Sequence, residues 1–157
     1  MFKDGFCNAI SHQELRDILK NEHPTIAMKD IALYDVRHPD LDYPGGHIVS
    51  SIHIPHYEFQ NIENRMESIM NQSLDKQLVI FHCMYSRNRG PLCYGWYSSF
   101  INQYCETNNN QITEKLKQQK ICLLSQGFLA FLNEYINDES NKDLIEDFDI
   151  NKWDITE

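Results

Sequence analysis

The sequence is poor in basic residues and has no long apolar segment. Lysine and arginine number 14 against 23 aspartates and glutamates, which gives a net charge of −9, and no basic stripe runs along the chain. We therefore expect no nucleic-acid binding. No apolar run approaches the length of a membrane span, and the first residues lack the basic-then-apolar pattern of a secretion signal. We expect no membrane association and a cytoplasmic protein, with the nucleus as a second location.

Cysteines are also few and irregularly spaced. The five are Cys7, Cys83, Cys93, Cys105 and Cys122. An odd number at irregular spacing is a poor disulfide framework, and no Cys-x-x-Cys pair indicates a metal site. We therefore expect free thiols in a reducing compartment and no bound metal.

The length of the chain, 157 residues, fits one domain with a sizeable core, which we place at residues 1–136. Residues 137–157 form an acidic tail with eight acidic and two basic side chains, a net charge of −6. Such a composition is typical of a disordered segment. The tail nevertheless contains Phe148, Ile150 and Trp153, and these apolar side chains favour docking of the tail on the domain.

Short apolar runs alternate with segments of helical periodicity. The runs at 31–36, 52–55, 78–81 and 121–124 are typical of buried strands. Helices are predicted at 11–20, 57–70, 91–104 and 129–136, the first with a capping box formed by Ser11 and Glu14. Strands that alternate with helices predict an α/β fold, in which helices flank both faces of a central, mostly parallel sheet. Ligands of such sheets bind at the carboxyl ends of the strands.

The stretch from Leu78 to Pro91 contains the residues with the clearest chemistry. After the apolar run, five residues separate Cys83 from Arg89, and Pro91 follows at a position that suits the first turn of a helix. A loop that enters a helix directs backbone N–H groups and the positive end of the helix dipole at one point, where an oxyanion binds. Arg89 adds a bidentate fork, and the same field favours the thiolate form of Cys83. The segment therefore predicts an oxyanion site with a nucleophile directed into it.

The residues from His82 to Pro91, His-Cys-Met-Tyr-Ser-Arg-Asn-Arg-Gly-Pro, resemble the active loop of the cell-division-cycle type dual-specificity phosphatases, also called M-phase inducer phosphatases. They are similar also to eukaryotic arsenate reductases and, most closely, to small yeast phosphatases of the same group. Asp35-Val36-Arg37 and Gly45-Gly46-His47-Ile48 resemble the group's first conserved blocks, whereas Gln126 stands where the group usually has glycine. The resemblance implies a single rhodanese-like domain.

The resemblance also implies a phosphatase mechanism. Cys83 would attack phosphorus and form a cysteinyl-phosphate, which water then hydrolyses. The substrate oxyanion would be bound by Arg89 and by the loop residues Met84, Tyr85, Ser86, Arg87 and Asn88, with His82 and Asp35 in supporting positions. The expected substrate is a phosphorylated protein or a small phosphoester, and no cofactor or metal is required. Sulfurtransferase loops of this fold are typically one residue shorter than the seven residues from Cys83 to Arg89, which argues against sulfur transfer.

The sequence leaves the general acid and the reaction type open. Animal phosphatases of the group often have glutamate where this chain has Asn88, and an amide does not act as an acid. The proton would then come from Asp40, from Asp42 or from the substrate. Asn88 is also similar to the residue of arsenate reductases, so arsenate reduction with glutathione or a glutaredoxin as thiol donor is an alternative. A non-catalytic module that binds phosphorylated ligands is a third interpretation.

Asp35 and Cys93 each have two interpretations. Asp35 stands at a strand end close to Arg37, which favours a structural ion pair over a role as general acid. Cys93 follows Cys83 by ten residues and is either a packed helix residue or a resolving thiol for oxidised Cys83. Val36 stands where the animal phosphatases carry their resolving cysteine.

Overall fold

The computed structural model describes residues 8–153, which leaves Cys7 and the last four residues of the predicted tail outside the description. Five parallel strands form one sheet in the order β1-β6-β5-β2-β4. They are β1 (Ala9–Ile10), β2 (Ile31–Asp35), β4 (Ile52–His53), β5 (Leu78–His82) and β6 (Lys120–Leu124). Two short strands, β3 (His47–Ile48) and β7 (Ile145–Glu146), pair antiparallel in a second small sheet. The predicted α/β architecture is confirmed, and β5 lies in the middle of the sheet.

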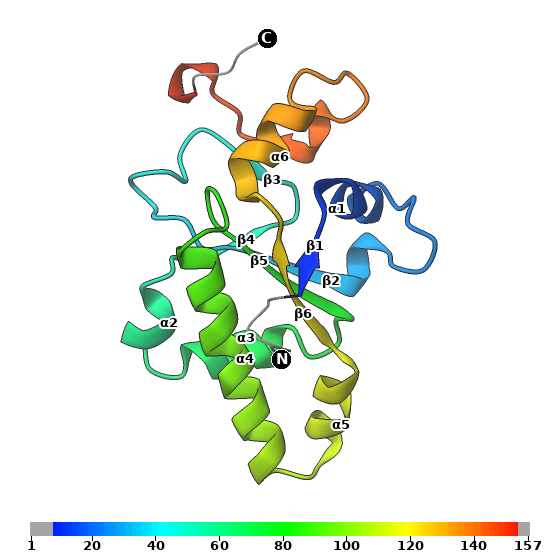
Figure 1. Ribbon diagram of the computed structural model, residues 1–157, viewed down its shortest axis with the longest axis vertical. Helices are drawn as coiled ribbons and strands as arrows, with labels where there is room; N and C mark the ends of the chain where they lie inside the picture. Colours follow the sequence, from blue (N-terminus) through cyan, green and yellow to red (C-terminus); the bar gives the residue numbers. More distant parts are fainter. Residues whose placement is uncertain (1–7, 154–157) are drawn as a thin grey trace.

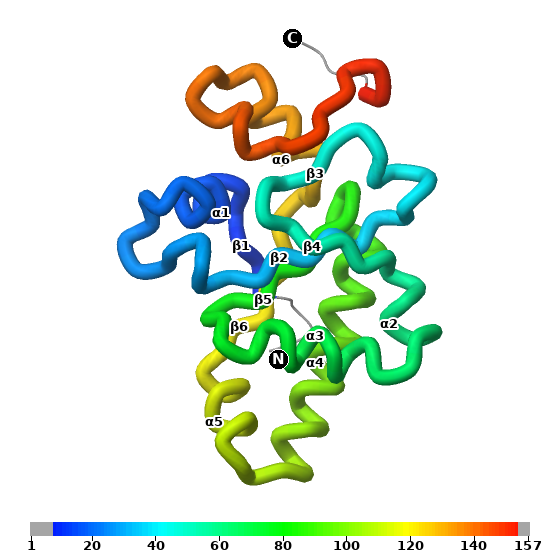
Figure 2. Tube along the Cα trace, turned by 180° about the vertical axis from the view of Figure 1, so that it is seen from behind, coloured from blue at the N-terminus to red at the C-terminus, as the bar shows by residue number. Residues whose placement is uncertain are grey.

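Helices cover both faces of this sheet (Figures 1 and 2). One face carries α1 (His12–Leu19) and α6 (Gly127–Tyr135), and the other carries α2 (Glu58–Asn61), α3 (Arg65–Gln72), α4 (Arg89–Thr107) and α5 (Gln111–Gln118). Short 3₁₀ turns occupy Met28–Asp30, Lys142–Leu144 and Ile150–Lys152. No helix within residues 8–153 is both long and apolar enough to cross a membrane.

The pleat of β5 divides its side chains between two apolar cores. Leu78 and Ile80 face α1 and α6, whereas Val79 and Phe81 face the helices on the other side. Because β5 pairs with β2 on one edge and β6 on the other, every residue of the strand is buried, which explains the uninterrupted apolar run. Burial of each of these large side chains contributes about 1.5–3 kcal/mol. The strand that leads into Cys83 is therefore held firmly in place.

The single helix predicted at 57–70 is wrong. The chain forms two short helices, α2 and α3, with an extended residue at Ile62 and a φ of 60° at Asn64 between them. Asparagine tolerates this left-handed conformation better than most residues. The break allows Phe59 of α2 and Ile69 of α3 to enter the same core, and it leaves Ile62 exposed.

The starts of α1 and α4 follow local hydrogen-bonding rules. Ser11 caps α1 as predicted, since its Oγ accepts the Glu14 N–H at 3.1 Å. α4 begins at Arg89, two residues earlier than the start predicted at Pro91. Pro91 is then the third residue of the helix, where a backbone N–H has no partner inside the helix, so the missing donor costs no helical hydrogen bond.

The acidic tail lies against the domain over its described part. β7 of the tail pairs with β3, and Phe148 and Trp153 pack on the core that contains α6. The Trp153 Nε1–H donates to the Gly45 carbonyl at 2.8 Å, whereas Ile150 is exposed. Figures 1 and 2 both show this segment next to the loop that precedes β3. The tail therefore holds the turn between β2 and β3.

Candidate active site

A short loop connects the carboxyl end of β5 to α4 (Figure 1). Cys83 and Arg89 lie at the two ends of this loop. The loop runs from Cys83 to Asn88, and α4 begins at Arg89. Ser86, in the middle of the loop, has a left-handed backbone with a φ of 52°. The loop leaves the sheet between β2 and β6, at the edge where parallel sheets bind their ligands.

The sulfur of Cys83 points at the amino end of α4. The residue is 2% exposed, and its Sγ accepts a hydrogen bond from the Gly90 N–H at 3.2 Å. A Cβ on Gly90 would lie 3.4 Å from this Sγ and 3.0 Å from the Leu123 side chain, so glycine permits the close approach of the helix. Hydrogen bonds from a helix amino end are stronger to an ionised acceptor than to a neutral one. The sulfur therefore lies where a nucleophile aimed at a bound anion is needed.

The turn between β6 and α6 supports the floor of the loop. The N–H groups of Phe128 and Leu129 donate to the carbonyls of Cys83 and Met84, both at 3.0 Å. Gln126 stands where the group usually has glycine. It adopts the left-handed backbone conformation that glycine favours, with a φ of 62°, so the turn into α6 still forms. The next residue, Gly127, has a φ of +71°, and a Cβ there would lie 2.6 Å from the Met84 oxygen.

Gly127→Ala is expected to destabilise the protein and to distort the loop. The left-handed backbone costs an L-residue about 1–2 kcal/mol, and the overlap with the loop backbone adds about 1–3 kcal/mol. Urea unfolding of the variant should show this loss, together with lower activity. Gly95→Ala, inside α4, is the matched control and is expected to stabilise the protein by about 0.5–1 kcal/mol through helix propensity. Equal effects of the two changes would contradict the assigned role of Gly127.

A buried ion pair lies beneath the loop. Arg37 and Asp35 are fully buried, and the Arg37 Nε and Nη2 donate to the Asp35 carboxylate at 2.6–3.0 Å. Arg37 also donates to the carbonyls of Asp42 and Gly46, each at 2.9 Å. Burial works against the charge of Asp35, but the hydrogen bonds and the positive charge of Arg37 more than offset it and lower the pKa of the carboxyl. Asp35 is therefore an ionised partner of Arg37 and not a proton donor facing the loop.

His82 ends β5 next to this pair. It is fully buried, with Nδ1 3.5 Å from the Cys83 carbonyl oxygen and Nε2 3.9 Å from an Asp35 oxygen. Burial lowers the pKa of His82 by more than the charge of Asp35 raises it. A neutral imidazole thus packs between the ion pair and the start of the loop.

Arg89 holds a carboxylate at the loop. Its Nη1 donates to Asp42 Oδ1 at 3.0 Å and its Nη2 donates to Asp42 Oδ2, so the guanidinium fork is paired with both oxygens. Asp42 Oδ1 also accepts the His38 N–H at 2.8 Å. The Asp42 hydrogen bonds raise the pKa of Arg89, and the charge of Cys83 acts in the same direction. Asp40, the other acid considered from the sequence, is exposed and its N–H donates to His38 Nδ1.

The remaining loop residues differ in the direction of their side chains. Met84 is buried in the core with α6, so its backbone and not its side chain is available to a ligand. Tyr85, Arg87 and Asn88 are exposed, and the Arg87 guanidinium lies 5.8 Å from the centre of the Tyr85 ring. Ser86 Oγ is buried and has no hydrogen-bond partner in the described part of the chain. A groove of about 460 Å³ runs between this loop and α6.

Comparison with known protein families agrees with this geometry. Residues 11–134 match the family model described as "Rhodanese-like domain". The chain belongs to the rhodanese-like domain family. This match covers the whole parallel sheet apart from β1, and it includes Cys83, Arg89 and the turn into α6. The family predicted from the loop is therefore confirmed.

Relatives of this rhodanese-like domain include two kinds of enzyme. The chain is 29% identical over 132 residues to an M-phase inducer phosphatase of Dictyostelium discoideum. This match covers 83% of this chain but 12% of the relative. The chain is also 29% identical over 98 residues to arsenate reductase 2.1 of Oryza sativa. This second match covers 62% of this chain and 54% of the relative. The domain thus spans much less than the full length of both proteins.

The fold is shared with a yeast protein of known structure. Ygr203w, described as a yeast protein tyrosine phosphatase of the rhodanese family, superposes with a TM-score of 0.72 at 23% identity. The match covers 96% of this chain and 100% of the yeast chain. It establishes that the rhodanese-like domain and its C-terminal segment have the same overall architecture as the yeast protein.

Cys93 lies in the rhodanese-like core, in the cluster that also contains Cys83. Burial raises the pKa of the Cys93 thiol, and the charge of Cys83 raises it further. Both effects disfavour the thiolate that a resolving cysteine needs. Cys83, Cys93, Cys105 and Cys122 are free thiols. A Cys83–Cys93 disulfide after oxidation stays a prediction, which intact-mass measurement of peroxide-treated protein tests.

The pairing of Asp42 with Arg89 could not be anticipated from the sequence, because the two residues are 47 positions apart in the chain. His56 is a second residue brought to this place. Its Nδ1 is buried and has no hydrogen-bond partner among residues 8–153. Burial lowers the pKa of His56, and the charge of Arg89 lowers it further. His56 lies in a segment without a sequence motif, so its proximity to Arg89 could not be predicted and results from the tertiary structure.

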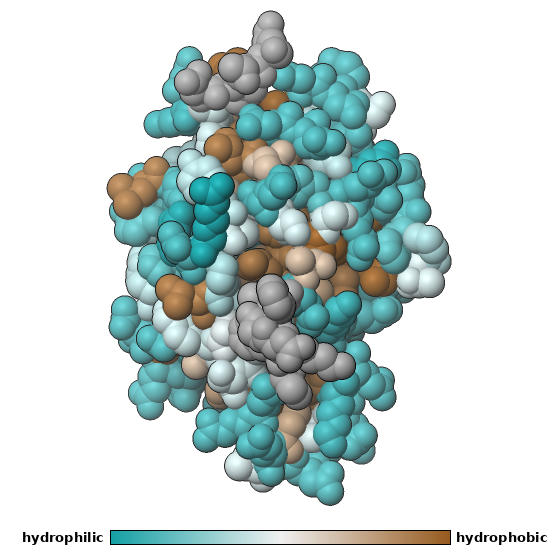
Figure 3. Space-filling model, in the orientation of Figure 1, coloured by the Kyte–Doolittle hydropathy of each residue, from teal (hydrophilic) through white to brown (hydrophobic). Residues whose placement is uncertain are grey.

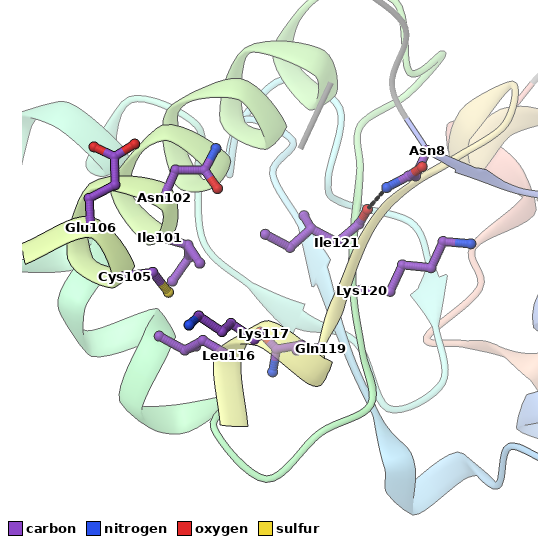
Figure 4. A pocket seen from close by; sticks show the side chains of 10 residues that line it. All are labelled: Asn8, Ile101, Asn102, Cys105, Glu106, Leu116, Lys117, Gln119, Lys120 and Ile121. Atoms are coloured by element: carbon purple, nitrogen blue, oxygen red, sulfur yellow. Dashed lines mark hydrogen bonds between the residues drawn. The ribbon is translucent and has the colours of Figure 1, made fainter. Parts of the chain in front are cut away.

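A second cavity lies at the opposite end of the sheet from the loop. It has a volume of about 530 Å³ and is lined from α4, α5 and β6, with Ile101, Cys105, Leu116 and Ile121 around it (Figure 4). Asn8 closes one side through its side-chain hydrogen bond to the Ile121 carbonyl. No cluster of histidine, cysteine or carboxylate side chains within residues 8–153 is arranged to hold a metal ion.

Proposed function

We propose that this rhodanese-like domain is a cysteine-dependent phosphatase for phosphotyrosine-like or mixed phosphomonoesters. The observation that carries the proposal is the position of Cys83 Sγ, which accepts the Gly90 N–H at the amino end of α4, with Arg89 at the end of the same loop. A free thiol at this position requires reducing conditions, so we propose the cytoplasm or the nucleus as its place of action.

The reaction has two steps. The Cys83 thiolate attacks phosphorus in line with the leaving oxygen, and a cysteinyl-phosphate forms. The loop N–H groups and the Arg89 guanidinium bind the equatorial oxygens, on which charge accumulates in the transition state. Water then attacks the phosphorus, inorganic phosphate leaves and the thiolate is restored. The chain supplies each of these groups without a cofactor.

The rim of the loop suits a substrate with an aromatic or otherwise apolar part. Exposed apolar side chains come from the segments around the loop: Leu41 next to Asp42, Tyr85 in the loop and Leu92 in the first turn of α4 are 80%, 52% and 49% exposed. Figure 3 shows scattered hydrophobic groups on a mainly hydrophilic surface. A phosphorylated protein side chain or a small aryl phosphate would contact these groups while its phosphate enters the loop.

Arsenate reduction is the second candidate. The same loop would bind arsenate, which has the charge and shape of phosphate, and the rice relative bears the name of that activity. Asn88, exposed at the amino end of α4, supplies no acid to a leaving group, and arsenate reduction needs no alcohol leaving group. In this reaction Cys83 would displace water from arsenic. Glutathione would then attack the Cys83 sulfur, so that arsenite leaves with the two electrons and a Cys83–glutathione disulfide remains, which a second thiol would reduce.

The two candidates are separated by assaying one preparation for both reactions. Wild type and Cys83→Ser are assayed for hydrolysis of para-nitrophenyl phosphate and for arsenate reduction coupled to glutathione. Para-nitrophenol is a good leaving group, so its release does not depend on a general acid. The phosphatase proposal predicts hydrolysis by wild type, none by Cys83→Ser, and little arsenate reduction.

Other outcomes would contradict the phosphatase proposal. Arsenate reduction with negligible phosphate hydrolysis would identify a reductase. Silence in both assays, with phosphate or a phosphopeptide still bound by wild type and Cys83→Ser, would indicate a module that binds phosphorylated ligands without turnover.

A further inference from the structure

The carboxylate of Asp42 occupies the part of Arg89 that a substrate needs. Both carboxylate oxygens accept from the Arg89 fork. A carboxylate and a phosphate present the same pair of acceptor oxygens to a guanidinium. Asp42 therefore lies where two oxygens of a bound oxyanion would lie, and a substrate has to displace it.

The backbone of Asp42 is fixed while its side chain can move. The buried Arg37 Nη1 donates to the Asp42 carbonyl at 2.9 Å, and the Tyr43 N–H donates to the His38 carbonyl at 3.1 Å. The Asp42 side chain is 19% exposed and turns on a two-bond stem. Rotation of the side chain would free Arg89 and leave the carboxyl at the rim of the loop, beside the oxygen that leaves the phosphorus.

The other acidic groups near the loop do not fit the role of proton donor. Asp35 is buried and bound by Arg37, and Asp40 is exposed, with its N–H on His38 Nδ1. Asn88 has no acidic proton. His56 lies near Arg89 and Asp42, and burial and the Arg89 charge favour its neutral form. Asp42 is the carboxyl that hydrogen bonds place at the oxyanion site.

We propose that Asp42 is the proton donor to the leaving group and that the substrate itself frees it, by taking Arg89 from its carboxylate. The inference rests on the proposed phosphatase function. In the empty site the guanidinium is paired with both oxygens of the carboxylate. When the phosphate replaces it on Arg89, the carboxylate faces a like charge, which favours uptake of a proton from solvent.

The proton balance then follows both chemical steps. As Sγ bonds to phosphorus and the ester P–O bond breaks, the Asp42 proton passes to the leaving oxygen and an alcohol departs. In the second step the oxygen of a water molecule bonds to phosphorus, and the Asp42 carboxylate takes a proton from this water. The S–P bond breaks, inorganic phosphate leaves, and Asp42 gives up the proton as it returns to Arg89.

The test compares Asp42→Asn with Asp40→Asn on two substrates that differ in leaving group. Asparagine keeps the size of Asp42 and an oxygen for the His38 N–H, and Asp40→Asn removes a neighbouring exposed charge. General acids contribute about 10²–10⁴-fold to poor leaving groups. We expect Asp42→Asn to lower kcat/KM for phenyl phosphate at least 100-fold, and that for para-nitrophenyl phosphate less than tenfold. It should also strengthen inhibition by inorganic phosphate several-fold, because the competing charge is gone.

The controls separate this inference from the proposed function. On each of the two substrates, Asp40→Asn should have a rate similar to that of wild type. Thermal melts should show that Asp42→Asn and Asp40→Asn both fold. An equal loss on both substrates in Asp42→Asn, or no loss on either, would overturn the role of Asp42 and leave the phosphatase intact. A wild type that hydrolyses neither substrate would instead refute the proposed function.

Discussion

Replacement of Arg89 by lysine is expected to lower kcat/KM for para-nitrophenyl phosphate by about 10³-fold. The guanidinium binds two equatorial oxygens with a planar fork, whereas an ammonium group offers a point charge without that geometry. Those oxygens gain charge in the transition state, so the loss should appear mainly in kcat and not in KM. Steady-state kinetics over a range of substrate concentrations separate the two parameters.

Arg87→Lys is the matched comparison, since it makes the same change two residues earlier in the same loop. Arg87 is exposed, and its guanidinium lies 5.8 Å from the centre of the Tyr85 ring. Its substitution should raise KM a few-fold through weaker attraction of the anion, with kcat little affected. Decreases in kcat of similar size in Arg89→Lys and Arg87→Lys would argue against specific stabilisation of the transition state by the Arg89 guanidinium.

Arg37→Met is expected to lower the free energy of unfolding by about 3–5 kcal/mol. The substitution leaves the fully buried Asp35 carboxylate without its partner and removes the donors that bind the carbonyls of Asp42 and Gly46. For a domain of this size the melting temperature should fall by roughly 6–20 °C. Thermal unfolding followed by circular dichroism measures the shift.

Two controls test the cause of this loss. Arg65→Met breaks an ion pair with Glu58 that is partly exposed, and it should cost about 1 kcal/mol or less. The double variant Asp35→Leu with Arg37→Met removes both charges and should be more stable than Arg37→Met alone. If Arg65→Met were as damaging as Arg37→Met, the unpaired buried charge would not be the reason.

The oxyanion loop could be predicted because everything that forms it is contiguous. Leu78 to Phe81 make the buried strand, Cys83 follows it directly, and Arg89 starts the next helix. Each signal depends on residues that are neighbours in the chain. The alternation of strands and helices was equally readable, since a parallel sheet buried on both faces needs continuous apolar runs.

The features that sequence reasoning missed depend on contacts between distant segments. Asp42 meets Arg89 only because β2 pairs with β5, which brings the loops that follow the two strands to the same edge of the sheet. The break between α2 and α3 depends on where Phe59 and Ile69 meet the core, and helical periodicity alone does not report it. The apolar residues of the acidic tail, in contrast, favour docking from the sequence alone, and Phe148 and Trp153 pack on the core that contains α6.

Rapid-quench mass spectrometry of the protein during turnover of para-nitrophenyl phosphate tests the central claim most directly. The account predicts one phosphoryl group per chain, located on the peptide that contains Cys83, formed together with a burst of para-nitrophenol and absent in Cys83→Ser. Hydrolysis that continues in Cys83→Ser, or a phosphoryl group on another residue of the wild type, would contradict it.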